Sequence, residues 1–254
     1  VTLTDTTIST NKTDNPFYKL AIADSSQHQL TFTGSGETIQ LYYETTENTL
    51  SNQALAIQCE KNSNNTIKRT FYAPNQSVLN AATTITLSDN SHLLISDTNN
   101  NNQGYILDTI TTTMGAAANL NCLNQTYLCN NSRFEHNVTV TGEESVARLH
   151  GLAINEVEQH CCYNTHVYHD TENSESHQLF KSLVKNNATL EYNGKVTVMP
   201  KAQQTNSYQL NQNIILDKFA NVYSRPQLFI DADDVKCSHG STTGDINKHE
   251  VLYL

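Results

Sequence analysis

A thiol and an imidazole stand two residues apart near the C-terminal end of the chain, as Cys237 and His239. They lie in a strand-like run that begins at Pro226. In an extended segment residues i and i+2 point to the same face, so the sulfur and the ring nitrogens would be presented together. A soft thiolate beside an imidazole suits iron, zinc or copper better than calcium or magnesium. The pair is a candidate metal site; the alternative is a buried small residue beside a turn histidine.

Two carboxylates precede this pair, on Asp233 and Asp234. As hard oxygen ligands they could guide iron toward the site. Two adjacent aspartates before a strand are also typical of a turn or of a solvated edge. Cys237 has a second interpretation too, because free cysteines are often small buried core residues.

A separate group of potential zinc ligands lies earlier in the chain. It comprises His160, Cys161, Cys162, His166 and His169. The residue types suit zinc, but the group lacks a Cys-x2-Cys pair. Adjacent cysteines in a strand also point to opposite faces. The spacing therefore argues against a zinc site.

The composition of the chain limits the class of protein to which these side chains can belong. The chain has 254 residues, a formal net charge of −10 and 37% hydrophobic residues, and it is rich in Asn, Thr, Gln and Ser. It has no basic cluster with which to bind nucleic acid phosphates. It contains neither an apolar stretch of about 18 residues nor a secretory start, so we expect a cytoplasmic protein. Six scattered cysteines favour reduced thiols over a disulfide framework.

Short strands separated by Asn, Asp, Gly and Ser dominate the chain. The clearest predicted strands are 29–33, 38–42, 84–87 and 92–95, with turns at 88–90 and at 97–102. Helical periodicity is scarce, and residues 176–185 allow a few helical turns at most.

A faint repeat narrows the architecture. Residues 188–198 can be laid over 220–230 with a constant offset of 32, and apolar or small residues alternate in both. Repeats of this size favour coils stacked into a solenoid. Asn193-Gly194 and Arg225-Pro226 would then lie at one corner between sheets. We expect a single all-β domain over residues 1–254, a right-handed parallel β-helix (β-solenoid), with a β-sandwich as the alternative.

The C-terminal half carries a more specific pattern. Its matching residues are His169, Ser176, Phe180-Lys181, Ala202 to Thr205, Gln209 to Leu216, Pro226 to Gly240 and Val251 to Leu254. Together they resemble the SufB/SufD family of bacterial and plastid iron–sulfur cluster assembly proteins. The Cys-Ser-His-Gly motif is closer to the SufD type than to the SufB type. Ser241, Asn206 and Leu252 depart from the family pattern without removing a candidate ligand.

The resemblance implies a scaffold and not an enzyme. SufD-like proteins pair with SufB through their β-helical cores, and the ATPase subunit SufC binds flanking helices that we expect to lie outside this chain, which would make it an excised core. The nascent iron–sulfur cluster, or iron, would then be held transiently at the interface, by His239 first and Cys237 second, with Asp233 and Asp234 as weaker candidates. We expect no stably bound cofactor in this chain alone. The sequence leaves open whether the chain forms a homodimer where SufB is absent.

Two other functions remain open from the residues. A carbohydrate-acting β-helix enzyme would need clustered carboxylates, for which Asp231, Asp233 and Asp234 are the candidates. A purely structural β-solenoid needs no site at all. No nucleotide-binding loop of the Gly-x4-Gly-Lys-Ser/Thr kind occurs, so any ATPase activity must belong to a partner.

Overall fold

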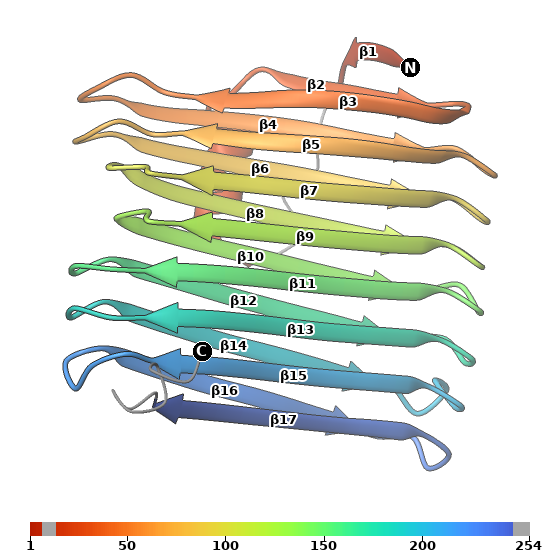
Figure 1. The fold of residues 1–254 in the computed structure, drawn as a ribbon. Coiled ribbons are helices and arrows are strands. Elements are labelled where there is room, and N and C mark those ends of the chain that lie inside the picture. Colours follow the sequence, from red (N-terminus) through yellow and green to blue (C-terminus); the bar gives the residue numbers. More distant parts are fainter. Residues whose placement is uncertain (7–13, 246–254) are drawn as a thin grey trace.

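The computed structural model describes residues 1–6 and 14–245, and within them nearly every segment is a β-strand (Figure 1). The strands form two sheets that face each other along the whole length of the molecule. The first sheet contains β1 (Thr2–Asp5), β2 (Gln27–Phe32), β4 (Leu50–Cys59), β6 (Val78–Leu87), β8 (Tyr105–Met114), β10 (Asn131–Val140), β12 (His160–His169), β14 (Thr189–Val198) and β16 (Asn221–Ile230). The second contains β3 (Ser35–Glu44), β5 (Asn64–Tyr72), β7 (His92–Asn100), β9 (Asn119–Tyr127), β11 (Val146–Asn155), β13 (Glu175–Val184), β15 (Asn206–Ile215) and β17 (Lys236–Asp245).

From β2 onward consecutive strands alternate between the two sheets, so that the chain winds as a β-solenoid. Apart from the antiparallel pair β1–β2, neighbouring strands are parallel and pair residue by residue. The register of β14 with β16 joins Thr189 to Asn221 and Val198 to Ile230, which is the offset of 32 seen in the sequence. The predicted parallel β-solenoid is confirmed.

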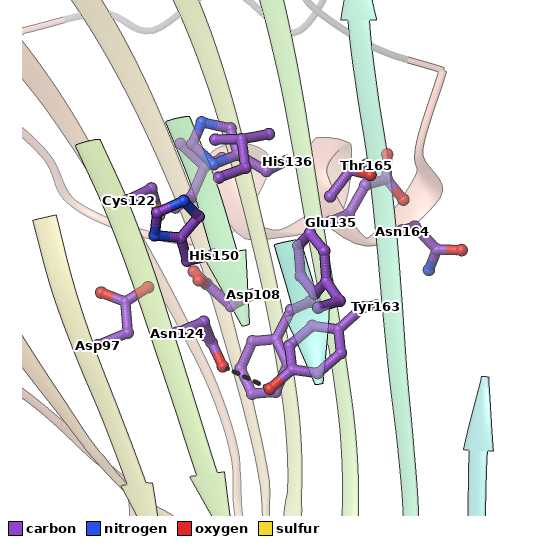
Figure 2. Close-up of a pocket in the computed structure, with 14 residues that line it drawn as sticks. Asp97, Asp108, Cys122, Asn124, Glu135, His136, His150, Tyr163, Asn164 and Thr165 are labelled. Atoms are coloured by element: carbon purple, nitrogen blue, oxygen red, sulfur yellow. Dashed lines mark hydrogen bonds between the residues drawn. The ribbon is translucent and has the colours of Figure 1, made fainter. Parts of the chain in front are cut away.

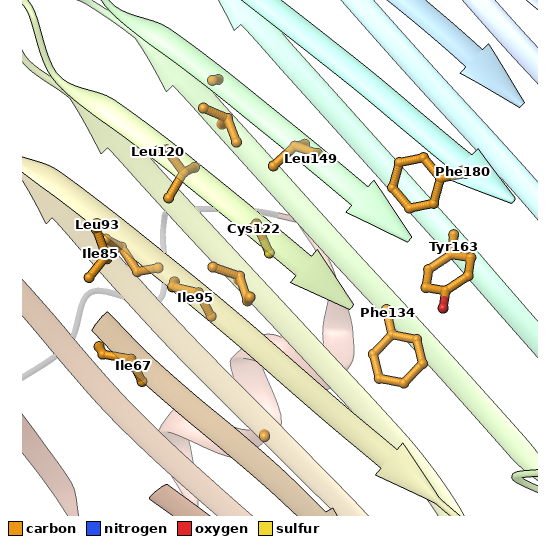
Figure 3. Close-up of a cluster of buried hydrophobic side chains, with 14 of the residues drawn as sticks. Ile67, Ile85, Leu93, Ile95, Leu120, Cys122, Phe134, Leu149, Tyr163 and Phe180 are labelled. Carbon is orange, nitrogen blue, oxygen red and sulfur yellow. The ribbon is translucent and has the colours of Figure 1, made fainter. Parts of the chain in front are cut away.

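The interior is narrow and holds polar as well as apolar side chains. Along the strands, buried residues alternate with more exposed ones, because alternate side chains face inward. Aromatic rings form a row inside the coils: ring centroids lie 5.6 Å apart for Phe134 and Tyr163 and 5.1 Å for Tyr163 and Phe180 (Figure 3). The row continues with Tyr192, whose ring centroid lies 4.9 Å from that of Phe180. Few inward positions per coil explain how a chain with so little apolar content folds.

The corners explain much of the asparagine content. Seven of the fourteen non-glycine residues with positive φ among the described residues are Asn. Asn adopts this left-handed conformation more readily than most residues. Asn90, at the predicted turn 88–90, is one of them.

Two local predictions are wrong. Residues 97–100 are the end of β7 and not a turn, and Asn99 and Asn102 are buried. Asn102 accepts a hydrogen bond from the backbone N–H of Ala73 (2.7 Å) and donates one to the backbone oxygen of Phe71 (3.0 Å). Residues 176–185, for which we expected some helix, form β13 and its end. Stacking pairs the backbone of each coil with its neighbours and so overrides weak local preferences.

The predicted corner at Asn193-Gly194 and Arg225-Pro226 is also wrong, since both pairs lie in mid-strand on β14 and β16. Gly194 is there for space: a Cβ at this position would lie 1.9 Å from Nε2 of Gln209 and 2.3 Å from the Tyr192 hydroxyl. Pro226 is tolerated because β16 is the last described strand of its sheet.

One helix, α1 (Pro16–Ala23), covers part of the first sheet. Asn15 caps it by accepting from the backbone N–H groups of Phe17 (2.8 Å) and Tyr18 (3.3 Å). Its buried face packs on Ala54 and Ala82. Among the residues that the structure describes, no helix has the length and apolar character needed to cross a bilayer.

Candidate functional site

Cys237 and His239 lie on β17, the last described strand of the eight-stranded sheet. The parallel register sets Cys237 beside Ser207 and His239 beside Gln209. Ser207 and Gln209 are buried inside the solenoid, so both candidate ligands lie on the inward face of the last coil. Within the described residues no further strand pairs with β17, and this end of the stack is open.

The two candidates differ in their surroundings. His239 is exposed to solvent, whereas Cys237 is half-buried and packs against a small apolar cluster that includes Val196 and Ala232. Burial raises the pKa of the Cys237 thiol, although a hydrogen bond with the Ser207 backbone lowers it in part. Because the thiolate is the form that binds metal, Cys237 is the weaker ligand of the resting chain.

A column of hydroxyl groups leads through the interior to Cys237. The buried His169 makes hydrogen bonds from Nδ1 to Oγ of Ser174 (2.7 Å) and from Nε2 to Oγ of Ser176 (2.8 Å). Ser176 is hydrogen-bonded in turn to Ser207 (2.8 Å between the Oγ atoms), which is the register neighbour of Cys237. Several residues of the sequence pattern therefore pack in one polar column.

A second column, Gln178 and Gln209, leads to His239. Gln178 Oε1 accepts hydrogen bonds from Thr165 Oγ1 (2.5 Å) and the Tyr192 hydroxyl (3.3 Å). Gln209 Nε2 donates to the Tyr192 hydroxyl (3.0 Å) and to Gln178 Oε1 (3.5 Å). Both glutamines are fully buried, so the position behind His239 is polar and well ordered.

A third group closes the last coil. Ser241 donates to Ser224 across the interior (2.8 Å between the Oγ atoms). Asn213 Nδ2 donates to Asn211 Oδ1 (2.6 Å) and to the backbone oxygen of Thr242 (3.4 Å). The contact with Ser224 joins β17 to β16, and the contact of Asn213 with Thr242 joins β17 to β15, both on the C-terminal side of His239.

Asp233 and Asp234 lie apart from this face. Both are exposed, in the corner between β16 and β17, and the backbone N–H of Asp234 donates to Gln203 Oε1 (2.9 Å). At about 3.3 Å of rise per strand residue, Asp234 is roughly 16 Å from His239 along the chain. Asp234 also borders a surface hollow of about 340 Å³ at this corner. Their role as iron guides stays a prediction.

The other histidine and cysteine group does not converge. Cys161 and His169 face the interior, whereas His160, Cys162 and His166 lie on the outward face of β12. His160 contacts Glu191 (3.1 Å), and His166 is hydrogen-bonded to Thr197 (3.0 Å). All six cysteines are free, as expected. In residues 1–6 and 14–245, no three His, Cys, Asp or Glu side chains are grouped to hold a metal ion.

The only strongly charged cluster that we find inside the described solenoid is remote from β17. Arg69, Asp97 and Asp108 are buried in its N-terminal half. Asp97 and Asp108 border an internal cavity of about 30 Å³, together with Cys122 and His136 (Figure 2). This volume suits about one water molecule and not a larger ligand.

Sequence reasoning missed the residues behind the candidate ligands. Ser207, Gln209, Asn211 and Asn213 alternate along β15, which is the two-residue period of a strand. Polar residues at alternate positions usually mark an outward face, so no sequence signal indicates that these side chains are buried.

Comparison with known proteins identifies the family of this chain. The family model described as "SUF system FeS cluster assembly, SufBD core domain" matches residues 42–254. The iron–sulfur cluster assembly protein SufD of Escherichia coli strain K12 is 33% identical over 140 residues, which are 54% of this chain and 33% of that protein. The chloroplastic protein ABCI7 of Arabidopsis thaliana is 34% identical over 122 residues, 47% of this chain and 26% of that protein.

The match also reaches the N-terminal half. SufD of Plasmodium falciparum isolate 3D7 is 25% identical over 217 residues, 82% of this chain and 15% of that protein. The matched segments thus span a third or less of the length of these relatives. Because the family model covers most of the chain and SufD proteins recur among its relatives, the chain belongs to the SufBD core family of iron–sulfur cluster assembly proteins and is of the SufD type.

Proposed function

We propose that this chain is a non-catalytic scaffold subunit, which pairs with a SufB subunit so that a nascent iron–sulfur cluster forms against His239. The observation that carries this proposal is the exposed imidazole of His239 on the inward face of the last described coil. Imidazole is an accepted cluster ligand beside thiolates. Cys237 is the second ligand, and it must lose its proton before it binds.

The partner supplies what this end lacks. His239 and Cys237 give two donors, whereas iron in clusters and zinc in structural sites each take about four ligands. Edges β16 and β17 each pair with one described strand only, which leaves backbone groups free for another chain. We assign the ATPase activity to a separate SufC subunit, because residues 1–254 contain no Gly-x4-Gly-Lys-Ser/Thr loop.

Removing the imidazole tests the proposal. In the full-length protein, in complex with SufB and SufC, we expect His239→Ala to reduce cluster formation at least about ten-fold, in line with the loss of a metal ligand. Cluster formation is measured from the iron and sulfide content and the visible absorption of the anaerobically reconstituted complex. His92→Ala, which removes an exposed histidine from β7, is the matched control and should behave as wild type. Normal cluster formation in His239→Ala would refute the ligand role.

Metal content of the isolated chain gives a second test. Two donors on an open face cannot hold iron tightly, so we expect less than about 0.1 iron or zinc per chain after anaerobic purification. Elemental analysis by mass spectrometry makes the measurement. One tightly bound metal ion per chain would contradict an interface site that a partner completes.

A further inference from the structure

We infer that Gln209 is a positioning residue for His239: its side-chain oxygen, which is unpaired in the structure, is the acceptor for one ring nitrogen when the imidazole turns toward it, and the other nitrogen is then left free at the open end of the solenoid. This inference rests on the proposed function, because it concerns how the candidate ligand is held. Histidines that bind metals almost always donate their second ring N–H to a carbonyl or carboxylate oxygen, which fixes the tautomer and the ring orientation.

The first observation is a buried acceptor with no partner. Gln209 is fully buried, and its Oε1 is a buried atom without a hydrogen bond. Buried polar atoms are almost always satisfied, so this exception calls for a group that can donate. His239 is the register neighbour of Gln209 on the same inward face, one strand spacing of about 4.8 Å away.

The second observation fixes which amide atom is left over. Gln178 Oε1 accepts from Thr165 and from the Tyr192 hydroxyl, which has therefore given its only proton. The Tyr192 oxygen can then act toward Gln209 only as an acceptor, and the atom of Gln209 beside it must be the amide nitrogen. With these donors and acceptors, the oxygen of Gln209 is the unpaired atom.

The third observation is that the absence of a side chain at Gly194 leaves room for the side chain of Gln209. A Cβ at Gly194 would collide with Nε2 of Gln209, so glycine at 194 is what admits the glutamine. In the next coil Pro226 takes the place of Gly194 in the register. Its ring has no hydrogen-bonding group to offer an imidazole, whereas Gln209, the register neighbour of His239, has an unpaired buried acceptor.

Nitrogen NMR of the ring tests the inference without any cluster. The full-length protein is labelled with ¹⁵N in its histidines, and long-range ¹H–¹⁵N spectra are recorded at pH 8.5, above the ordinary pKa of imidazole of about 6.5. The His239 signals are assigned by their loss in His239→Asn. We expect one tautomer to dominate in the wild type, and Gln209→Met to change the tautomer ratio by about three- to ten-fold, as the loss of one hydrogen bond would.

Gln212→Met is the matched control, because it removes the same amide from the outward face of the same strand, outside this network. It should leave the His239 tautomer ratio unchanged. Equal effects of the two variants, or no effect of Gln209→Met, would overturn the inference. If Gln209→Met does not fold, the wild type decides alone: a His239 ring with the tautomer ratio of a free histidine side chain also overturns it.

The two proposals can fail separately. If His239→Ala prevents cluster formation while the ring shows no preferred tautomer, the ligand role stands and the positioning role of Gln209 falls. If the tautomer is fixed by Gln209 while His239→Ala still forms clusters, the positioning contact stands and the ligand role falls.

Discussion

Arg69→Met should lower the free energy of unfolding by about 3 to 5 kcal/mol at neutral pH, because it leaves two buried carboxylates without their counter-ion. Arg69 is fully buried on β5 and lies between Asp97 on β7 and Asp108 on β8. Its five N–H groups make two hydrogen bonds to each carboxylate, at 2.7 to 3.1 Å, and one to Thr83 (3.2 Å). Denaturant unfolding followed by circular dichroism measures the loss.

The size of this defect should depend on pH. Burial raises the pKa of Asp108 to about 6 even in the presence of Arg69, whose charge lowers it, and the charge of Asp97 adds to the rise. Without Arg69 the carboxyl takes up a proton still more readily, and a neutral acid costs less to bury. The destabilisation in Arg69→Met should therefore shrink between pH 8 and pH 5.

Two controls separate the buried charge from the lost volume. Replacing all three residues with apolar side chains, as Arg69→Met with Asp97→Leu and Asp108→Leu, should restore much of the stability, because no charge remains unpaired. Arg148→Met removes a cation from the outward face of β11 and should change stability by no more than about 0.5 kcal/mol. A full defect in the triple variant would show that packing, and not charge, explains the effect of Arg69.

The sequence predicts the solenoid because alternation and a repeat offset are properties of the chain itself. Residues 188–198 and 220–230 align in the sequence and pair in the structure. The corner prediction at Asn193-Gly194 failed because Asn-Gly usually marks a turn, whereas here Gly194 makes room for Gln209. Which side chain faces Gly194 across the interior depends on the tertiary structure, and local sequence patterns do not contain that information.

The candidate site, too, has features that the sequence predicts and features that depend on the tertiary structure. The two-residue spacing of Cys237 and His239 is enough to place them on one face. Their different exposure depends on β17 being the last described strand and on the apolar cluster beneath Cys237. The role of Gln209 depends on stacking, which brings residues 30 positions apart into register.

Acid should destabilise the fold through two buried neutral histidines. Burial lowers the pKa of His136 to about 3, with the positive charge of Arg69 as a further cause, and burial lowers the pKa of His169 to about 4. A histidine in the unfolded chain has a pKa near 6.5. Below that pH these two histidines are therefore protonated in the unfolded chain but stay neutral in the folded chain. Stability is therefore complete above pH 6.5 and falls as the pH decreases, by on the order of 2 to 3 kcal/mol per histidine at pH 4.5.

Asp108 acts in the opposite direction, because its folded pKa of about 6 lies above the ordinary carboxyl value. The folded chain gains that proton first, which stabilises it as the pH falls from 6 toward 4 and offsets roughly one of the two histidines. We expect His136→Gln and His169→Gln each to flatten the fall in unfolding free energy between pH 7.5 and pH 4.5, measured by urea titration at several pH values. His92→Gln, on an exposed position, should keep the wild-type slope. Parallel slopes in all four proteins would mean that acid acts elsewhere, whereas a flatter slope in the buried variants alone would assign the loss to the neutral histidines inside the solenoid.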